Sequence, residues 1–252
     1  TPELAQVLSL LRADANPMPH KQLVSVLKEQ WGDDWLSRFS HIELRSFAAA
    51  SIGQVHLAYI ENGDQLAVKI QYPGISKSVV SDVDNVITLL TLSRLLPKEL
   101  DIKPLVEEAK AQLLAEADYT LEAQYLARYK NLLSTNPHFK VPSVYVEHST
   151  AQVLTMEYVD AKPIEGICDL SAAERSHVAE QLINLFFKEM FEFKLIQTDP
   201  NFANFHYQPE SQKIVLFDFG ATREITATLS DAYLALFKAG SNNDRAGVLN
   251  AA

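Results

Sequence analysis

Apolar and polar residues alternate through residues 51–60 and again through 66–71, and Asn62-Gly63 lies between the two runs. A period of two is typical of strands with one buried face, and Asn-Gly favours a tight hairpin turn. We therefore expect a β-hairpin that ends at Pro73-Gly74. The apolar segment before it closes in Ala48-Ala49-Ala50-Ser51, which predicts a strand followed by a loop of small residues.

Elsewhere apolar residues recur every three or four positions, a spacing that predicts helices. Two of the helices have clear start signals: Pro104 lies in a first turn, and Ser171 with Glu174 forms a capping box. The helices expected from this spacing cover residues 1–11, 20–31, 76–96, 104–133, 171–196 and 228–239.

Two short apolar segments, 141–147 and 153–159, are expected to complete an antiparallel sheet of about five strands. Residues 205–207 and 213–219 flank the turn 208–212 and predict a second hairpin. The order of elements predicts an α+β protein. Its first lobe, residues 1–158, holds a small antiparallel sheet with inserted helices, and its second, mainly helical lobe covers residues 159–252.

The 252 residues are 47% hydrophobic and 21% charged, which is typical of a globular protein with a sizeable core. The net charge of −10 argues against nucleic acid as a partner. A single cysteine, Cys168, excludes an intramolecular disulfide and fits a reducing compartment. No signal peptide or long apolar run is evident, so we expect a cytoplasmic protein if the source is bacterial, at most peripheral to a membrane. Since the first residue is Thr1 and the last residues have a helical pattern, we expect a domain cut from a longer protein.

Lys69 lies in the strand 66–71, flanked by apolar residues. An ammonium at such a position is costly unless it meets an anion, and a phosphate with a helix carboxylate would supply one. A water-exposed lysine at a strand edge is the simpler alternative. The candidate carboxylates are Glu116, Asp118 and Glu122, which could equally form a solvated acidic face.

Asp199 and Asn204 are five residues apart after an apolar helix, the spacing of a kinase catalytic loop. The aspartate would orient the proton of an attacking hydroxyl or water, and the asparagine would supply an oxygen to Mg²⁺. A simple Asp-Pro turn is the alternative. Asp218 closes an apolar strand before Phe219-Gly220, where a hard oxygen ligand typically faces Mg²⁺. The order of Lys69, the helix carboxylate, Asp199, Asn204 and Asp218 predicts a phosphoryl-transfer site.

The segment around Glu157 and Val159 would be the connector whose main chain meets adenine, with Met156 at the back of the pocket. An ordinary buried strand is the alternative for this stretch.

The chain resembles the UbiB/aarF-domain (ADCK) family of atypical kinases, which is linked to coenzyme Q biosynthesis. The resemblance begins near residue 18 and continues to the C-terminus. Residues 3–6 depart from the family's Lys-x-Gly-Gln segment, which we expect to precede this sequence. The segments that match family signatures are FAAASIGQVHLA, AVKIQYPGI, EADYTLEA, QTDPNFANF and LFDFGATRE.

The resemblance implies a kinase-like fold that binds ATP or ADP with Mg²⁺. It assigns the phosphate loop to Ala48, Ala49, Ala50 and Ser51, the nucleotide lysine to Lys69, and the catalytic acid to Asp199. Metal ligands would be Asn204 and Asp218. Further nucleotide-site residues would be Val55, Glu116, Asp118, Glu122, Glu157 and Val159, with Glu122 or Glu116 as the partner of Lys69.

Alanines restrict the loop conformations that glycines would allow, and little chain separates Gly220 from the last helix. Both features argue against protein kinase activity. An atypical kinase or ATPase of ubiquinone biosynthesis is the first interpretation. Its partners would be a quinone-precursor lipid, a membrane surface and other proteins of that pathway. A nucleotide-switched pseudokinase scaffold and a small-molecule phosphotransferase are the alternatives.

Overall fold

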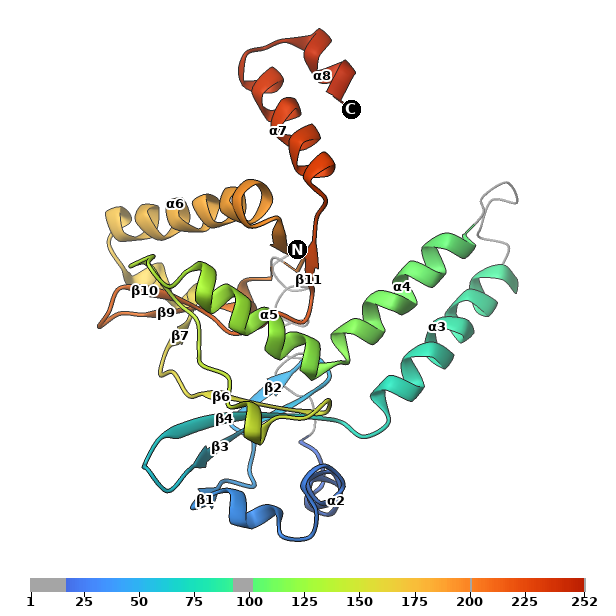
Figure 1. Cartoon of the computed structure of the whole chain (residues 1–252), viewed down its shortest axis with the longest axis vertical. Helices are drawn as coiled ribbons and strands as arrows, with labels where there is room; N and C mark the ends of the chain where they lie inside the picture. The colour runs from blue at the N-terminus through green and yellow to red at the C-terminus, as the bar shows by residue number, and fades with distance from the viewer. Residues whose placement is uncertain (1–16, 93–101, 200, 252) are drawn as a thin grey trace. The chain divides into compact units, whose positions relative to one another are not determined.

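The computed structural model describes residues 17–92, 102–199 and 201–251 (Figure 1). Tertiary contacts divide the chain into two units, the first comprising Thr1–Ala127 with Pro142–Val159 and the second Arg128–Val141 with Asp160–Ala252. The helix expected over residues 1–11 lies outside the described residues. The lobe boundary expected after residue 158 stays a prediction.

The first unit contains a five-stranded antiparallel sheet, as expected. Its order is β1-β3-β4-β6, and β2 pairs with β3 away from that path. The turn at Asn62-Gly63 is confirmed, and Gly63 has the positive φ of 89° that favours glycine there. The strands are β1 (His41–Ile42), β2 (Ala48–Ala50), β3 (Gly53–Tyr59), β4 (Gln65–Gln71) and β6 (Val153–Glu157).

Two expectations about this sheet were wrong. Ala48–Ala50 is strand β2 and not a loop, because it pairs with β3 as far as Ala50 opposite Gly53. Residues 141–147 form no strand beyond an isolated bridge from Val144 to Met156. Pro142 cannot donate a ladder hydrogen bond, and a 3₁₀ turn follows at Val146–His148.

Helix α2 (His20–Trp31) has the predicted bounds and covers one face of this sheet. Leu23, Val26 and Leu27 are buried in one cluster with the β4 residues Val68 and Ile70. Because side chains alternate across a strand, the residues between these β4 positions point to the opposite face. That face carries Lys69.

Helices α3 (Ile75–Leu92) and α4 (Lys103–Glu116) lie side by side in Figure 1, joined by an ion pair of 2.7 Å between Lys110 and Asp84. The helix expected over 76–96 is confirmed as far as Leu92, and its remainder, residues 93–96, lies outside the described residues.

The single helix expected over 104–133 is wrong: it breaks at Ala117-Asp118, and α5 (Tyr119–Leu132) begins after the break. The Gln71 amide donates to the Ala117 carbonyl at 2.7 Å, which satisfies a terminal carbonyl of α4. Asp118 Oδ1 accepts from the Thr120 N–H at 2.9 Å and caps α5. The break therefore has a partner on β4 and a cap of its own.

In the second unit, Ser171 and Glu174 form the predicted capping box of α6 (Ala172–Lys188). A π-helical turn, Glu189–Phe193, continues α6 and ends at Lys194, whose φ is 52°. The helix expected to residue 196 was thus too long, because this left-handed residue turns the chain into strand β8 (Leu195–Gln197).

Four strands of the second unit form a sheet in the order β5-β10-β9-β7. The hairpin of β9 (Phe205–Gln208) and β10 (Lys213–Leu216) is confirmed, and β5 (Phe139–Lys140) and β7 (Lys162–Pro163) flank it. Strand β8 pairs antiparallel with β11 (Thr222–Glu224), and α7 (Ala227–Ser241) and α8 (Arg245–Ala251) follow. In the described ranges, none of the helices has the length and apolar character that crossing a bilayer requires.

Candidate functional site

Lys69 is 6% exposed, so it is not the water-exposed lysine of the alternative interpretation. Its Nζ donates to both carboxylate oxygens of Glu122, at 2.9 and 3.0 Å, and lies 5.0 Å from the centre of the Tyr119 ring. Glu122 itself is 1% exposed. Among the three candidate carboxylates, Glu122 is therefore the one that contacts the lysine in the structure.

The other two carboxylates lie at the break between α4 and α5. Glu116 is the last residue of α4 and is half-buried, whereas Asp118 is exposed and caps α5. A role of Glu116 and Asp118 toward a nucleotide stays a prediction.

Lys69 lies in register with the alanine segment across three strands. Ala48 is opposite Val55, and Val55 is opposite Lys69. Directly opposed residues of antiparallel strands share a face, so these three side chains lie on the sheet face away from α2. Ala49 is exposed, Ala50 is half-buried, and Ser51 lies exposed in the turn after β2.

The predicted connector belongs to β6 and the residues just after it. The N–H of Glu157 donates to the Ser143 carbonyl at 2.8 Å. Because this hydrogen bond uses the N–H, we no longer count it among the main-chain groups expected to contact a purine. Met156 and Val159 are buried. Contacts of Glu157 or Val159 with a purine stay a prediction.

In the second unit, the Asn204 amide nitrogen donates to Asp199 Oδ2 at 3.1 Å and to the Asp199 carbonyl at 3.2 Å. Asp199 is exposed and Asn204 is half-buried. Because the amide nitrogen is used in these contacts, the amide oxygen is the atom of Asn204 suited to a cation.

Asp218 and Asn204 lie at one end of the β9–β10 hairpin. Phe205 is opposite Leu216 in the antiparallel register, Asn204 directly precedes Phe205, and Asp218 follows Leu216 by two residues. Asp218 is half-buried, and its Oδ1 accepts from the Gly220 N–H at 3.0 Å. A carboxylate and an amide oxygen at one hairpin end fit Mg²⁺, which prefers hard oxygen ligands and is completed by waters and phosphates.

The structure therefore brings the predicted residues together in two sets, each within one unit. Lys69, Glu122, Val55 and Ala48 form the first set, and Asp199, Asn204 and Asp218 form the second.

Sequence reasoning missed three polar residues next to the second set: Tyr129, Glu189 and Gln197. Glu189 and Tyr129 are buried and hydrogen-bonded to each other, and the Gln197 side chain donates to the Asp218 carbonyl. An acid inside the apolar run LFFKEMFEF was the available signal for Glu189.

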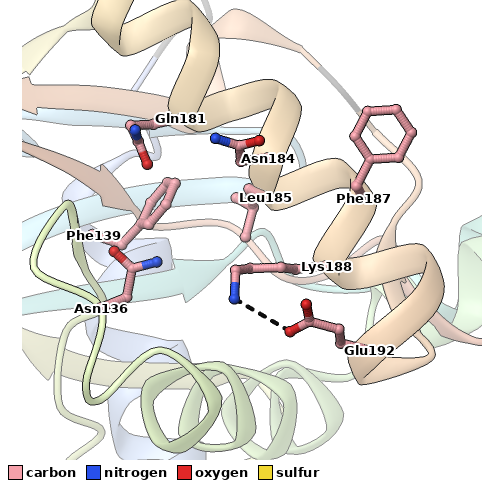
Figure 2. Close-up of a pocket in the computed structure, with 8 residues that line it drawn as sticks. All are labelled: Asn136, Phe139, Gln181, Asn184, Leu185, Phe187, Lys188 and Glu192. Carbon is pink, nitrogen blue, oxygen red and sulfur yellow. Dashed lines mark hydrogen bonds and ion pairs between the residues drawn. The ribbon is translucent and has the colours of Figure 1, made fainter.

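Figure 2 shows a pocket of about 240 Å³ between α6 and the segment before β5. Amide side chains of Asn136, Gln181 and Asn184 line it beside Phe139, and Lys188 reaches toward Glu192 at one end. A second, apolar groove of about 410 Å³ lies between α3 and α4. Predicted site residues line neither of these two pockets.

Residues 10–252 match the model of the ABC1 atypical kinase-like domain. The chain belongs to this family. The family resemblance and the kinase-like α+β fold expected from the sequence are thereby confirmed.

Relatives in this family include the proteins named atypical kinase COQ8B, mitochondrial, from Danio rerio and Rattus norvegicus. They are 40% and 41% identical over 98% and 99% of this chain, which covers 40% and 47% of their lengths. Atypical kinase COQ8, mitochondrial, of Saccharomyces cerevisiae is 38% identical over 97% of the chain and is covered to 49%. The chain thus spans less than half the length of these three relatives.

A solved structure with a similar fold is Rv3197 of Mycobacterium tuberculosis, described as a complex with erythromycin. The TM-score is 0.78 at 26% identity, over 94% of this chain and 60% of that one. Erythromycin is the ligand named for that complex and is not assigned to this chain.

Proposed function

We propose that this chain is the nucleotide-binding part of an atypical kinase or ATPase that acts in ubiquinone biosynthesis. It would bind ATP or ADP with Mg²⁺. The observation that carries the proposal is the buried ion pair between Lys69 and Glu122 on the sheet face that also holds Ala48 and Val55. The family match and the relatives named atypical kinases support the activity.

Within this proposal, Lys69 binds a phosphate and Glu122 fixes the direction of its ammonium. Asn204 and Asp218 would hold Mg²⁺, which supplies charge neutralisation of the phosphates when bound. Asp199 would orient the proton of the attacking hydroxyl or water, since Asn204 fixes its carboxylate from one side.

Protein substrates are disfavoured by the segment after Gly220. Strand β11 follows at Thr222–Glu224 and α7 begins at Ala227, which leaves little chain for a peptide-docking activation segment. A quinone-precursor lipid, a membrane surface or pathway proteins are the partners we propose instead. The named relatives are mitochondrial proteins, and for this chain we propose a reducing compartment, which the free Cys168 supports.

The test is thermal unfolding with Mg²⁺ and ADP or ATP. At about 100 times Kd, ligand binding stabilises the folded state by about 2.7 kcal/mol, equivalent to roughly 5–10 °C for a chain of this size. EDTA and Asp218→Asn should each remove most of this shift. Asp231→Asn, an exposed aspartate on α7, is the matched control and should keep it.

Asp199→Asn should keep the shift but lose ATP hydrolysis, measured with and without quinone-precursor phenols and anionic lipid. A melting temperature unmoved by millimolar Mg-nucleotide would overturn the proposal. Binding by the wild type without any turnover would favour the pseudokinase scaffold.

A further inference from the structure

Strand β8 has a neighbouring strand on one edge only among the described residues. Toward β11, the Thr198 N–H donates to Ala221 and the Lys194 carbonyl accepts from Ile225, both at 3.0 Å. Main-chain groups of alternate residues point to opposite edges of an antiparallel strand. The Leu195 carbonyl and the Gln197 N–H therefore point away from β11.

Two buried side chains meet these main-chain groups in place of a strand. The Tyr129 hydroxyl lies 3.0 Å from the Leu195 carbonyl and 2.8 Å from Glu189 Oε1. The Gln197 N–H lies beside the same two side chains, Glu189 and Tyr129. Tyr129 is 0% and Glu189 6% exposed. We call Tyr129 and Glu189 the buried clamp.

The number of available protons shows which protonation state of Glu189 fits the hydrogen bonds of the buried clamp. The Tyr129 hydroxyl has one proton but lies within hydrogen-bond distance of two acceptors, Glu189 and the Leu195 carbonyl. If Glu189 is neutral, its own O–H donates to Tyr129, Tyr129 donates to Leu195, and all of these groups are satisfied. Burial favours the same neutral form.

The segment held by the buried clamp leads to both predicted acidic residues of the second unit. Asp199 follows Gln197 by two residues, and the Gln197 side-chain amide donates to the Asp218 carbonyl. The Tyr129 ring also packs on Phe219, next to Asp218, with 4.6 Å between ring centres.

We propose that Tyr129 and Glu189 are positioning residues that hold β8 so that Asp199 and Asp218 keep their geometry toward Mg-nucleotide. This role rests on the proposed function, but the clamp itself does not. Tyr129→Phe removes the hydroxyl while keeping the ring, and Glu189→Leu removes both carboxyl oxygens. Glu189→Gln retains a polar group beside Gln197 and a donor for Tyr129, so it should act as the rescuing variant.

Amide hydrogen exchange tests the clamp without any ligand. In the wild type, the Gln197 amide should exchange slowly although it faces away from β11. In Tyr129→Phe and Glu189→Leu it should exchange about tenfold faster or more, because local opening costs less. Glu189→Gln should stay close to the wild type.

A Mg²⁺ titration at fixed ADP concentration tests the positioning role. Loss of a group that orients a metal ligand typically costs about 10–100-fold in metal affinity. Tyr129→Phe should therefore raise the Mg²⁺ concentration for half-maximal ADP binding by about tenfold. Ser230→Ala is the matched control: Ser230 donates to the Met190 carbonyl of the same π-helical turn at 2.8 Å but not to β8.

Faster exchange at Gln197 together with the higher Mg²⁺ requirement, and neither in Ser230→Ala, would support the proposal. Unchanged exchange in Tyr129→Phe would overturn the clamp. Faster exchange with an unchanged Mg²⁺ requirement, or an equal change in Ser230→Ala, would overturn the positioning role.

If the wild type fails to bind Mg-ADP at all, the proposed function fails, and the positioning role with it, while the exchange data still test the clamp. Should Glu189→Leu not fold, Tyr129→Phe and Glu189→Gln carry both measurements.

Discussion

Each unit of this protein contains a buried glutamate, and the two are stabilised in opposite ways. Glu122, in the first unit, accepts two hydrogen bonds from the ammonium of Lys69. Glu189, in the second, is hydrogen-bonded to the neutral Tyr129 hydroxyl and lies beside the neutral Gln197 N–H. The exposed fractions are similar, at 1% and 6%.

The comparison shows that similar burial leads to different chemistry when the partner differs. A buried ion pair is stable only while both charges are present, and its cation can also serve an incoming phosphate. A buried carboxyl group among neutral polar groups is favoured in its protonated form, because desolvation penalises the charge. The first glutamate therefore orients a charge, whereas the second orients a strand.

The largest effect is expected from breaking the ion pair. Lys69→Met leaves the Glu122 carboxylate buried without its ammonium, so the free energy of unfolding should fall by about 3–5 kcal/mol. Lys69→Met/Glu122→Met, which replaces both charges by apolar side chains, should lose much less than the sum of the single variants. Urea unfolding of the wild type, Lys69→Met, Glu122→Met and the double variant at pH 7 measures the difference. Additive losses would show that the two side chains are not coupled.

A smaller effect is expected from the second glutamate, and it depends on pH. Burial raises the pKa of Glu189 from 4.5 to about 7. Since the folded-state pKa is the higher one, its stabilising contribution is complete below pH 4.5 and is lost as the pH rises through 7. Relative to Glu189→Gln, the wild type should lose about 2–3 kcal/mol of unfolding free energy over this range.

The titratable groups around Glu189 do not cancel this expected loss of unfolding free energy. Tyr129 faces it from α5, and the neighbouring Arg128 is paired with Glu224 of β11. Burial and the Glu189 charge raise the pKa of Tyr129, so this hydroxyl stays protonated throughout the range. Urea unfolding of wild type and Glu189→Gln between pH 4.5 and 8 checks the prediction, and parallel pH profiles would contradict it.

Elements whose signals are local could be predicted from the sequence. Helix α2 has the expected bounds because its apolar period is regular and Gly32 follows it with a φ of 87°. The capping box of α6 and the Asn62-Gly63 turn were found for the same reason. Each of these signals lies within a few residues of the structure that it determines.

Features that depend on distant partners could not be predicted in this way. The break between α4 and α5 is satisfied by Gln71, which lies 46 residues before Ala117 in the sequence. The sequence offered Glu116, Asp118 and Glu122 as partners of Lys69. The break places Glu116 at the end of α4 and Asp118 at the cap of α5, whereas Glu122 lies within α5 and contacts the lysine. Tyr129 and Glu189 are 60 residues apart, so neither residue alone indicates the clamp.

The smallest effects are expected from two reciprocal substitutions in the strands near Lys69, Gly53→Ala and Ala49→Gly. A Cβ on Gly53 would lie 2.2 Å from the Ile70 carbonyl oxygen, directly next to Lys69. Gly53→Ala should therefore shift β4 and cost about 1–3 kcal/mol. Ala49→Gly, at an exposed position of β2 opposite Gln54, should cost only about 0.5–1 kcal/mol.

The reciprocal substitutions also separate two explanations of the alanine segment. If Ala48–Ala50 restricts how β2 and its turn approach phosphates, the wider φ range of glycine at position 49 should change the ratio of ATP to ADP affinities. Gly53→Ala should instead weaken both nucleotides together, because it displaces the strand of Lys69. Titrating both nucleotides into both variants and the wild type measures these ratios. An unchanged ratio in Ala49→Gly would make the alanines ordinary strand residues, while the proposal that the Lys69–Glu122 ion pair serves the nucleotide would be unaffected.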